Sequence, residues 1–424
     1  MSPREASNVN PFRLAELIAR RPINWNKYAD ETQAMCEILN ISKQELFARN
    51  CPVLTPYTKT MADGSVKVLS EQEAQARLES YLAARTKRRI TKTPPMRRLA
   101  LKTVRSRLPE LLFPDSAQGR TGAKPVETDW SMEGCSWRDM GEYFKETPEF
   151  DDPIQGNVGD CYLIAAMSGV AWTRPYAITN RAAHSSFGDD ESPKHKFTFY
   201  NTGGDKTGTT VEVSEKVLVN TTGSTPQWIY ACSRDTNETW PAVLEKAYAK
   251  WRSGASGDCP NMETLKSGVA AAAAIALIGG SGYWTEHNDT TAEKLWTHIL
   301  SNCLGSRTVN PMFALTPDLE EGDPRLSEYA VANIITCHFY TILGWESRDG
   351  KNYVVLRNPW GYAVPTIDVL SGSWKFQDFD GKWYSIPFDR PDQHNGIFAL
   401  EINTFYRYFL ETSLVQNDLI GRPC

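Results

Sequence analysis

The sequence lacks any long run of apolar residues. Its longest, VAAAAAIALI from Val269 to Ile278, is about half of the roughly 20 residues that a helix needs to cross a bilayer. The N-terminal stretch MSPREASNVNPFRLAELIARR holds no apolar core of signal-peptide length, because arginines bound or interrupt it. We therefore expect no transmembrane segment, an intracellular, cytoplasmic protein, and a buried helix over residues 269–278.

The sequence also lacks the cysteine spacings of a disulfide framework or a zinc site. Its 9 cysteines are scattered through 424 residues without a repeated interval, and neither CxxC nor a paired cysteine/histidine spacing occurs. This pattern favours a reducing compartment. Each cysteine must then be judged by its own surroundings.

A strong net charge is missing too, and the formal value of -5 gives the chain no overall attraction to nucleic acid or anionic lipid. The exception is residues 85–107 (RTKRRITKTPPMRRLALKTVRSR), which contain no acidic residue and are broken by Pro94 and Pro95. The simpler interpretation is a solvated helix pair with a kinked linker. The alternative is a docking surface for an acidic partner or a membrane surface. Nucleic acid is not expected, because the stretch lacks the interleaved aromatic residues on which single strands stack.

Three regions follow one another along the chain. Residues 1–114 show mostly helical periodicity, as in SEQEAQARLESYLAAR, and predict a small helical N-terminal region that includes the basic stretch. The polar, glycine-rich DSAQGRTGAKPVETD opens a second region, residues 115–283, whose clearest elements are helical. The third region, residues 284–424, is rich in strand patterns. This organisation predicts an α+β protein.

Two helices and one hairpin are well marked. CYLIAAMSGVAW is apolar almost all round and predicts a helix buried at a domain centre, with Asp160 at its N-cap or first turn. WPAVLEKAYAKW, residues 240–251, predicts an amphipathic helix. CHFYTILGW and NYVVLRN are strand patterns joined by ESRDGK, in which Asp349-Gly350 is a hairpin signal.

Cys161 stands at the start of the buried helix. There the unpaired N–H groups and the positive end of the helix dipole are expected to lower the pKa of the thiol, and the thiolate is the nucleophilic form. Gly156 and Gly159, just before it, let the backbone approach a substrate and adopt positive φ. A cysteine at the head of an apolar helix is by itself more often a small packed side chain, so a catalytic role requires partners elsewhere.

A thiolate that works near pH 7 needs a base, and the chain has 6 histidines to supply one: His184, His195, His287, His298, His338 and His394. His338 has the most suggestive setting, because it begins the strand HFYTILGW. The next strand of the predicted hairpin ends at Asn358, whose amide would come beside the imidazole and could orient it. The alternative is a core histidine and an asparagine in a turn before proline.

These motifs together resemble the calpain family of cysteine proteases. QGNVGDCYLIAAMSG is similar to the calpain signature around the nucleophile, WPAVLEKAYAKW to the helix that follows, and CHFYTILGW with LRNPWG to the histidine and asparagine motifs. NGIFALEINTFYRYF resembles the end of the protease core, so the resemblance covers about residues 130–409. It implies a papain-like two-lobed core, with a helical cysteine lobe and a β-sheet lobe carrying histidine and asparagine. The resemblance is to a short, atypical member, without a penta-EF-hand domain and with an N-terminal region that matches nothing in the family.

The resemblance assigns roles to five residues. Cys161 is the implied nucleophile, His338 the general base and then acid, and Asn358 the group that orients His338. Gln155 is similar to the side-chain donor of the oxyanion hole, and Trp360 to the tryptophan that covers the histidine–asparagine contact. The implied reaction is limited cleavage of protein or peptide substrates through a thioester acyl-enzyme.

Two residues beside this site depart from the family pattern. Tyr162 follows the nucleophile where calpains usually carry tryptophan, and Cys337 precedes the histidine where they usually carry glycine. Tyrosine keeps an aromatic ring with a polar tip, so we expect activity to survive that change. A cysteine in place of glycine is expected to crowd the histidine loop or to make it redox-sensitive.

Calcium is implied as a candidate cofactor, but less completely. Asp152 and Glu263 match acidic ligand positions of the first calcium site in a calpain core, although the upstream glycine-rich carbonyl loop is not recognisable. The second site looks lost, because Asp368 is the only acidic residue in YAVPTIDVLSG. Calcium takes about six to eight oxygen ligands, so a half-kept site would bind it weakly.

Two other functions stay open at this point. The same core could bind peptides as a scaffold without cutting them, although a complete set of cysteine, histidine, asparagine and glutamine argues against a dead site. Transglutaminase-like and deubiquitinating enzymes use similar groups for acyl transfer and isopeptide cleavage. LRNPWG favours the protease.

Overall fold

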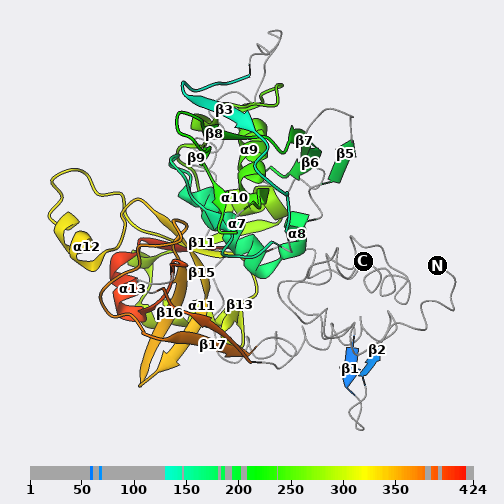
Figure 1. The fold of residues 1–424 in the computed structure, drawn as a ribbon. Coiled ribbons are helices and arrows are strands. Elements are labelled where there is room, and N and C mark those ends of the chain that lie inside the picture. The colour runs from blue at the N-terminus through cyan, green and yellow to red at the C-terminus, as the bar shows by residue number, and fades with distance from the viewer. Residues whose placement is uncertain are drawn as a thin grey trace.

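The computed structural model describes residues 58–60, 66–68, 129–145, 148–179, 183–186, 193–201, 208–235, 237–377, 383–389 and 394–416. Within residues 1–114 these include an antiparallel pair of short strands, β1 (Thr58–Thr60) and β2 (Val66–Val68). The helices expected in residues 1–114 and the basic stretch 85–107 lie outside the described residues, so both remain predictions. From residue 129 onward, α7 to α10 and the sheet around β15 and β16 occupy different parts of the molecule (Figure 1).

Helices and antiparallel sheets are both present, which agrees with the α+β class. The helices are α7 (Cys161–Thr173), α8 (Pro175–Thr179), α9 (Trp240–Ser253), α10 (Ala270–Ile278), α11 (Ala292–Ser301), α12 (Leu326–Ala332) and α13 (Ile402–Tyr408), with two 3-10 turns, η2 (Met262–Leu265) and η3 (His287–Asp289). The earlier strands are β3 (Cys135–Arg138), β4 (Pro153–Ile154), β5 (Ala183–Ser186), β6 (Lys194–Phe199), β7 (Thr209–Ser214), β8 (Val217–Asn220), β9 (Gln227–Trp228) and β10 (Cys232–Ser233). The later strands are β11 (Ser281–Glu286), β12 (Cys303–Leu304), β13 (Arg307–Thr308), β14 (Met312–Leu315), β15 (Phe339–Arg348), β16 (Lys351–Arg357), β17 (Ser373–Gln377), β18 (Trp383–Pro387), β19 (Ile397–Glu401) and β20 (Glu411–Gln416).

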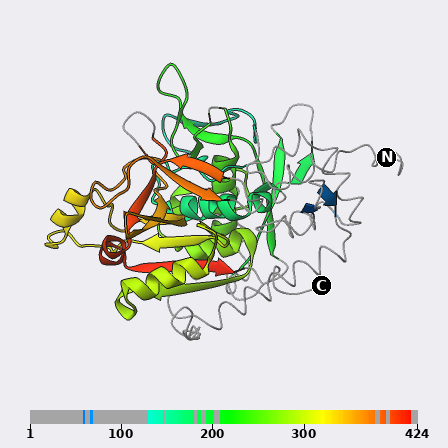
Figure 2. The same ribbon diagram turned by 90° about the horizontal axis from the view of Figure 1, so that it is seen from below.

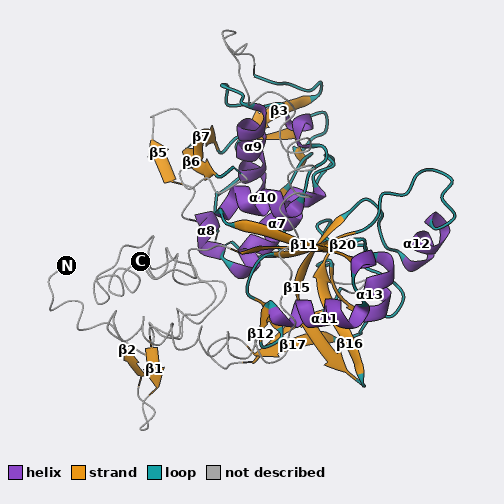
Figure 3. Cartoon of the chain, turned by 180° about the vertical axis from the view of Figure 1, so that it is seen from behind, coloured by secondary structure: helices purple, strands orange, loops and turns teal. Residues whose placement is uncertain are grey.

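Helix α7 carries Cys161 and forms where the sequence predicts it. Every residue after Cys161 is buried, because α10 packs against one side of the helix and β15 against another. On the β15 side, Thr341 Oγ1 donates a hydrogen bond of 2.9 Å to the carbonyl oxygen of Ala165. α10, the predicted buried helix, lies next to α7 (Figure 3) and none of its side chains is exposed. Of the described helices, none is both long and apolar enough to cross a membrane.

Strands β15 and β16 form the predicted hairpin. They pair antiparallel from Arg348↔Lys351 at the turn to Thr341↔Arg357 at the far end. Asp349 and Gly350 both have positive φ (53° and 76°), the backbone that a two-residue type I′ turn requires. The hairpin belongs to an eight-stranded sheet in which β16 also pairs with β19. Its open end therefore places residues 338 and 358 next to each other.

Two hydrophobic clusters account for most of the core. One gathers around α7, α9 and α10, and the other is formed by the large sheet with α11 and α13. The predicted boundary after residue 283 falls inside β11, which is hydrogen-bonded to β20 in the large sheet. In Figure 2 the green helices of the first cluster lie against the yellow-to-red elements of the second.

Buried arginines join α7 to the sheet. Arg357, at the end of β16, donates 2.8 Å hydrogen bonds to Ser168 Oγ and the carbonyl oxygen of Asp151. Arg307 donates to the carbonyl oxygen of Trp172 at 2.9 Å and lies 4.2 Å from the centre of its ring. Each guanidinium is at most 1% exposed, so truncating either would leave buried carbonyls without donors. These contacts hold the middle and the C-terminal end of α7 against the sheet.

Candidate active site

Cys161 is the first residue of α7, as the sequence predicts, but its acidity is not as expected. Burial, with a smaller contribution from the nearby Asp160, raises the pKa of the thiol to about 12. Hydrogen bonds from the backbone of Phe339 and Tyr162 act in the opposite direction and do not compensate. The expected lowering by the helix N-terminus is therefore outweighed by desolvation. In this arrangement Cys161 is a neutral thiol that requires a base.

The imidazole of His338 and the amide of Asn358 are in direct contact. Nε2 of His338 lies 2.9 Å from Oδ1 of Asn358, and both residues are buried. The amide orientation is fixed by two backbone partners, because Asn358 Nδ2 donates to the carbonyl oxygen of Ala363 and the N–H of Trp360 donates to Oδ1. Oδ1 can only accept, so Nε2 of His338 carries the proton in the neutral ring. Nδ1 is then the basic nitrogen, and the proximity predicted from the hairpin is confirmed.

Burial also controls the charge of His338. It lowers the pKa of the imidazole to about 4, and the hydrogen bond to Asn358 offsets only part of this. The ring centre of Trp360 lies 5.0 Å from that of His338, so the tryptophan packs against the imidazole. At neutral pH the ring is uncharged and able to accept a proton. Among the described residues, the imidazole makes no hydrogen bond to Cys161 Sγ.

Thr316 holds the backbone of His338 and was not identified from the sequence. Its hydroxyl accepts a 3.0 Å hydrogen bond from the N–H of His338, and its own N–H donates to the carbonyl oxygen of His338 at 3.1 Å. Thr316 follows β14, which pairs with β15. A lone threonine after a strand gives no sequence signal, because only the pairing of β14 with β15 brings it to the histidine.

Gln155 connects the segment before Cys161 to the asparagine motif. Its backbone N–H donates a 3.0 Å hydrogen bond to the carbonyl oxygen of Pro359, the residue after Asn358. Its side-chain Nε2 donates to the carbonyl oxygen of Val158 at 2.8 Å. That bond uses one of the two amide hydrogens and leaves the other for a ligand. The structure thus brings Gln155 beside the histidine–asparagine contact.

The two departures from the family pattern have local explanations. Cys337 adopts a left-handed backbone with φ of 50°, a conformation that glycine takes without strain, and its side chain is exposed. The ring of Tyr162 is buried, and its hydroxyl accepts a hydrogen bond from Arg252. A side chain at Gly268 would collide with the Tyr162 ring, since an added Cβ would lie 2.5 Å from it. Tyrosine therefore keeps the packed ring and gives its polar tip a partner.

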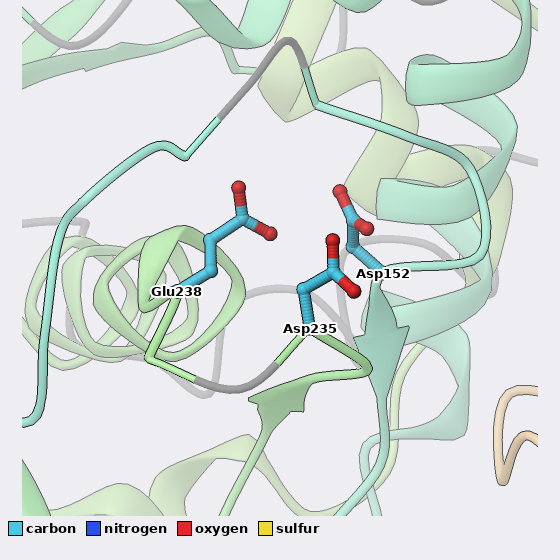
Figure 4. A group of neighbouring side chains, drawn as sticks. All are labelled: Asp152, Asp235 and Glu238. Atoms are coloured by element: carbon cyan, nitrogen blue, oxygen red, sulfur yellow. The ribbon is translucent and has the colours of Figure 1, made fainter.

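The predicted calcium ligands are not brought into one set of carboxylates. Asp152 belongs to a group with Asp235 and Glu238, whose carboxylate oxygens lie within 4.8 Å of one another (Figure 4). Glu263 is not part of this group, and its carboxylate instead binds Lys266 and accepts a hydrogen bond from the hydroxyl of Tyr230.

Oxygens of Asp152 and Glu238 already have protein partners. Asp152 Oδ2 accepts hydrogen bonds from the indole of Trp240 at 3.0 Å and the N–H of Glu149. Glu238 accepts from Ser233 Oγ and from the N–H of Lys145. Burial raises the pKa of Asp152 to about 9, so this carboxyl is neutral at pH 7. Calcium prefers several ionised or carbonyl oxygens, and these residues as arranged do not fit that requirement.

A thiol at the N-terminus of α7, an imidazole held by an amide, and a glutamine bonded to the turn after that amide are the groups that a cysteine peptidase requires. Comparison with known families agrees, since the model of the calpain family cysteine proteases matches residues 116–416. The chain therefore belongs to the calpain family, and it is a cysteine-type endopeptidase.

Individual relatives support the same family. A thiol protease of Porphyromonas gingivalis is 25% identical over 440 residues, covering 94% of this chain and 85% of that protein. Calpain clp-1 of Caenorhabditis elegans is 26% identical over 313 residues, which cover 71% of this chain and 36% of that protein. Human calpain-9 is 26% identical over 265 residues, covering 59% of this chain and 34% of calpain-9. The chain thus spans about a third of the length of these two calpains but most of the bacterial protease.

Proposed function

We propose that the chain cleaves protein substrates at a limited number of peptide bonds through a thioester acyl-enzyme. The observation that carries the proposal is the hydrogen bond between His338 Nε2 and Asn358 Oδ1. Because the amide holds the proton on Nε2, Nδ1 remains available as the base that a neutral Cys161 thiol needs.

The steps follow from these protonation states. His338 Nδ1 takes the thiol proton of Cys161 as the sulfur attacks the substrate carbonyl carbon, and Asn358 stabilises the imidazolium that forms. The free amide hydrogen of Gln155 and the backbone N–H of Cys161 stabilise the oxyanion. His338 then protonates the leaving amine, which departs as the thioester forms. Water activated by His338 hydrolyses the thioester and restores the thiol.

The proposed architecture is a papain-like pair of lobes with an extended peptide bound between them. Two hydrophobic clusters support it, one around α7 with Cys161 and one in the sheet that contains the β15–β16 hairpin. We place the protein in the cytoplasm, because the described cysteines are free thiols.

A second candidate is a peptide-binding scaffold with weak catalysis. It is favoured by the neutral thiol of Cys161 and by the lack of a hydrogen bond between that thiol and His338 in the described structure. Acyl transfer on the same core shares the first half of the mechanism and differs only in the group that attacks the thioester.

A thiol-reactive peptide ketone, applied to the full chain with added calcium and with a calcium chelator, separates these functions. A peptidase incorporates the probe at Cys161, and His338→Ala abolishes the labelling. His394→Ala is the matched control, since its ring is exposed and bonded to Asp389, and it should label like the unmodified chain. No labelling under either condition would support the scaffold. The products formed by a labelled, active enzyme then distinguish hydrolysis from acyl transfer. Equal labelling with calcium and with the chelator would show that calcium does not control the site.

A further inference from the structure

Two buried carboxyl groups meet directly behind the nucleophile. Asp160, the residue before Cys161, and Glu245, in the middle of α9, are both 0% exposed, and their carboxyl groups interact with each other. Oδ1 and Oδ2 of Asp160 and Oε1 of Glu245 are buried and accept no hydrogen bond from an N–H or O–H donor of the described residues. Asp160 occupies the N-cap position of α7, yet its side chain does not cap the helix as its position predicts. Its carboxyl group turns to Glu245 instead. A hydrogen bond between two carboxyl groups needs a proton on at least one of them.

Glu245 also holds the segment against which the nucleophile loop packs. Its Oε2 accepts a 3.1 Å hydrogen bond from the N–H of Ala231. Two residues earlier, the carbonyl oxygen of Ile229 accepts a 2.8 Å hydrogen bond from Asn157. Gly156 lies so close to this segment that an added Cβ would be 2.4 Å from the Ile229 oxygen. Glu245 therefore links α9, residues 229–231 and the loop between Gln155 and Cys161.

Among the described residues, no cation acts on the pair to neutralise a second negative charge. Desolvation raises the pKa of Asp160 to about 7, and that of Glu245 well above its usual range. The titratable groups that act on the pair are thiols and phenols with raised pKa values, and none of them is a cation: Cys161, Tyr162, Tyr230 and Cys232. All four are neutral between about pH 5.5 and 9. Below about pH 7 the pair holds two protons, and above it the pair holds one.

We propose that Asp160 and Glu245 form a proton-sharing pair that positions the first turn of α7 and sets the acidity of the Cys161 thiol. The proposal deepens the proposed function and rests on Cys161 being its nucleophile. When Asp160 ionises, its negative charge opposes a thiolate on the adjacent residue. Glu245 is the positioning residue, since it acts on the thiol only through Asp160. The pair thus makes thiol reactivity increase less steeply with pH as Asp160 loses its proton.

Alkylation of Cys161 by iodoacetamide, followed by mass spectrometry of the full chain between pH 5.5 and 8.5, tests the pair without requiring proteolysis. Asp160→Asn removes the charge and keeps the shape, so its rate should equal that of the unmodified chain at pH 5.5 and exceed it at least about threefold at pH 8.5. Glu245→Gln retains a donor to Asp160 and an acceptor for Ala231, and it leaves unchanged the burial that raises the pKa of Asp160. Its rate should therefore equal that of the unmodified chain at both pH 5.5 and pH 8.5.

Glu215→Gln is the control for loss of a buried carboxylate, because Glu215 pairs with His195 rather than with the α7 N-terminus. Its rate ratio to the unmodified chain should not depend on pH. If the ratio for Asp160→Asn is also independent of pH, the proposal is wrong and the pair has only a structural role. A pH-dependent ratio for Glu245→Gln would equally overturn it. A chain that shows the expected ratio for Asp160→Asn but cleaves no peptide would retain the pair and refute the peptidase function.

Discussion

The backbone N–H of Gln155 lies 3.0 Å from the carbonyl oxygen of Pro359, so the loop before the thiol is hydrogen-bonded to the turn after Asn358. Gly361 in the same turn also packs near Ile154, where an added Cβ would be 3.4 Å away. Gln155, the proposed oxyanion donor, is therefore hydrogen-bonded to the residue next to Asn358. Substitutions in the turn after Asn358 are expected to displace the loop between Gln155 and Cys161.

Asn358→Ala should lower kcat about 10²-fold with little change in KM. The imidazole would lose the acceptor that keeps its proton on Nε2, and general acid–base catalysis typically contributes about 10²–10⁴-fold. Steady-state hydrolysis of a peptide substrate measures this. Asn352→Ala, on the same hairpin but bonded only to the hydroxyl of Ser347, is the matched control and should retain full activity. Equal loss in both variants would point to a folding defect of the hairpin.

Gln155→Ala should reduce kcat about 10²–10³-fold, the usual cost of removing one oxyanion donor. Iodoacetamide alkylation of Cys161 passes through no oxyanion, so it should change far less than peptide hydrolysis. Gln227→Ala, an exposed glutamine on β9, provides the comparison. A parallel fall in alkylation and hydrolysis would instead mean that Gln155 only supports the loop.

His287 should make the protein less stable in acid. Burial lowers its pKa from 6.5 to about 4, so between these values the unfolded chain binds a proton that the folded chain does not. The free energy of unfolding therefore falls as pH drops from about 6.5 to 4, by up to about 1.4 kcal/mol per pH unit. His287→Gln should flatten the plot of Tm against pH across this window. An unchanged slope would show that His287 titrates normally.

Asp152→Asn should stabilise the protein at neutral and alkaline pH. The pKa of Asp152 rises from 3.8 to about 9 on folding, so the stability that its protonated form contributes below pH 3.8 is lost as pH rises toward 9. Asparagine still accepts the hydrogen bond from Trp240 and does not titrate. Its gain in Tm over the unmodified chain should grow from pH 4 to pH 9, whereas Asp289→Asn, an exposed control, should show none.

If calcium binds at Asp152, Asp152→Asn should be less stable than the unmodified chain when calcium is added. The unmodified chain would then gain Tm with calcium, and Asp152→Asn would lose that gain. Identical Tm values with calcium and with a chelator would show that the raised pKa of Asp152 reflects burial alone.

The local elements could be predicted from the sequence because their patterns are local. Apolar residues on all sides of CYLIAAMSGVAW specify a buried helix, and Asp349-Gly350 between two strand patterns specifies the hairpin that brings His338 to Asn358. The roles of Gln155, Cys161, His338 and Asn358 were indicated by the resemblance of their motifs to those of calpains.

Only the tertiary structure decided the charges and the supporting contacts. The helix N-terminus favours a thiolate at Cys161, but desolvation depends on which segments cover the sulfur, and here it prevails. Thr316 beside His338 and Glu245 beside Asp160 come from distant segments, so no spacing in the sequence marks them. The sequence by itself determined which groups are present and which helix and hairpin carry them. Packing determined which of those groups are charged, because burial and hydrogen bonding are properties of the folded chain.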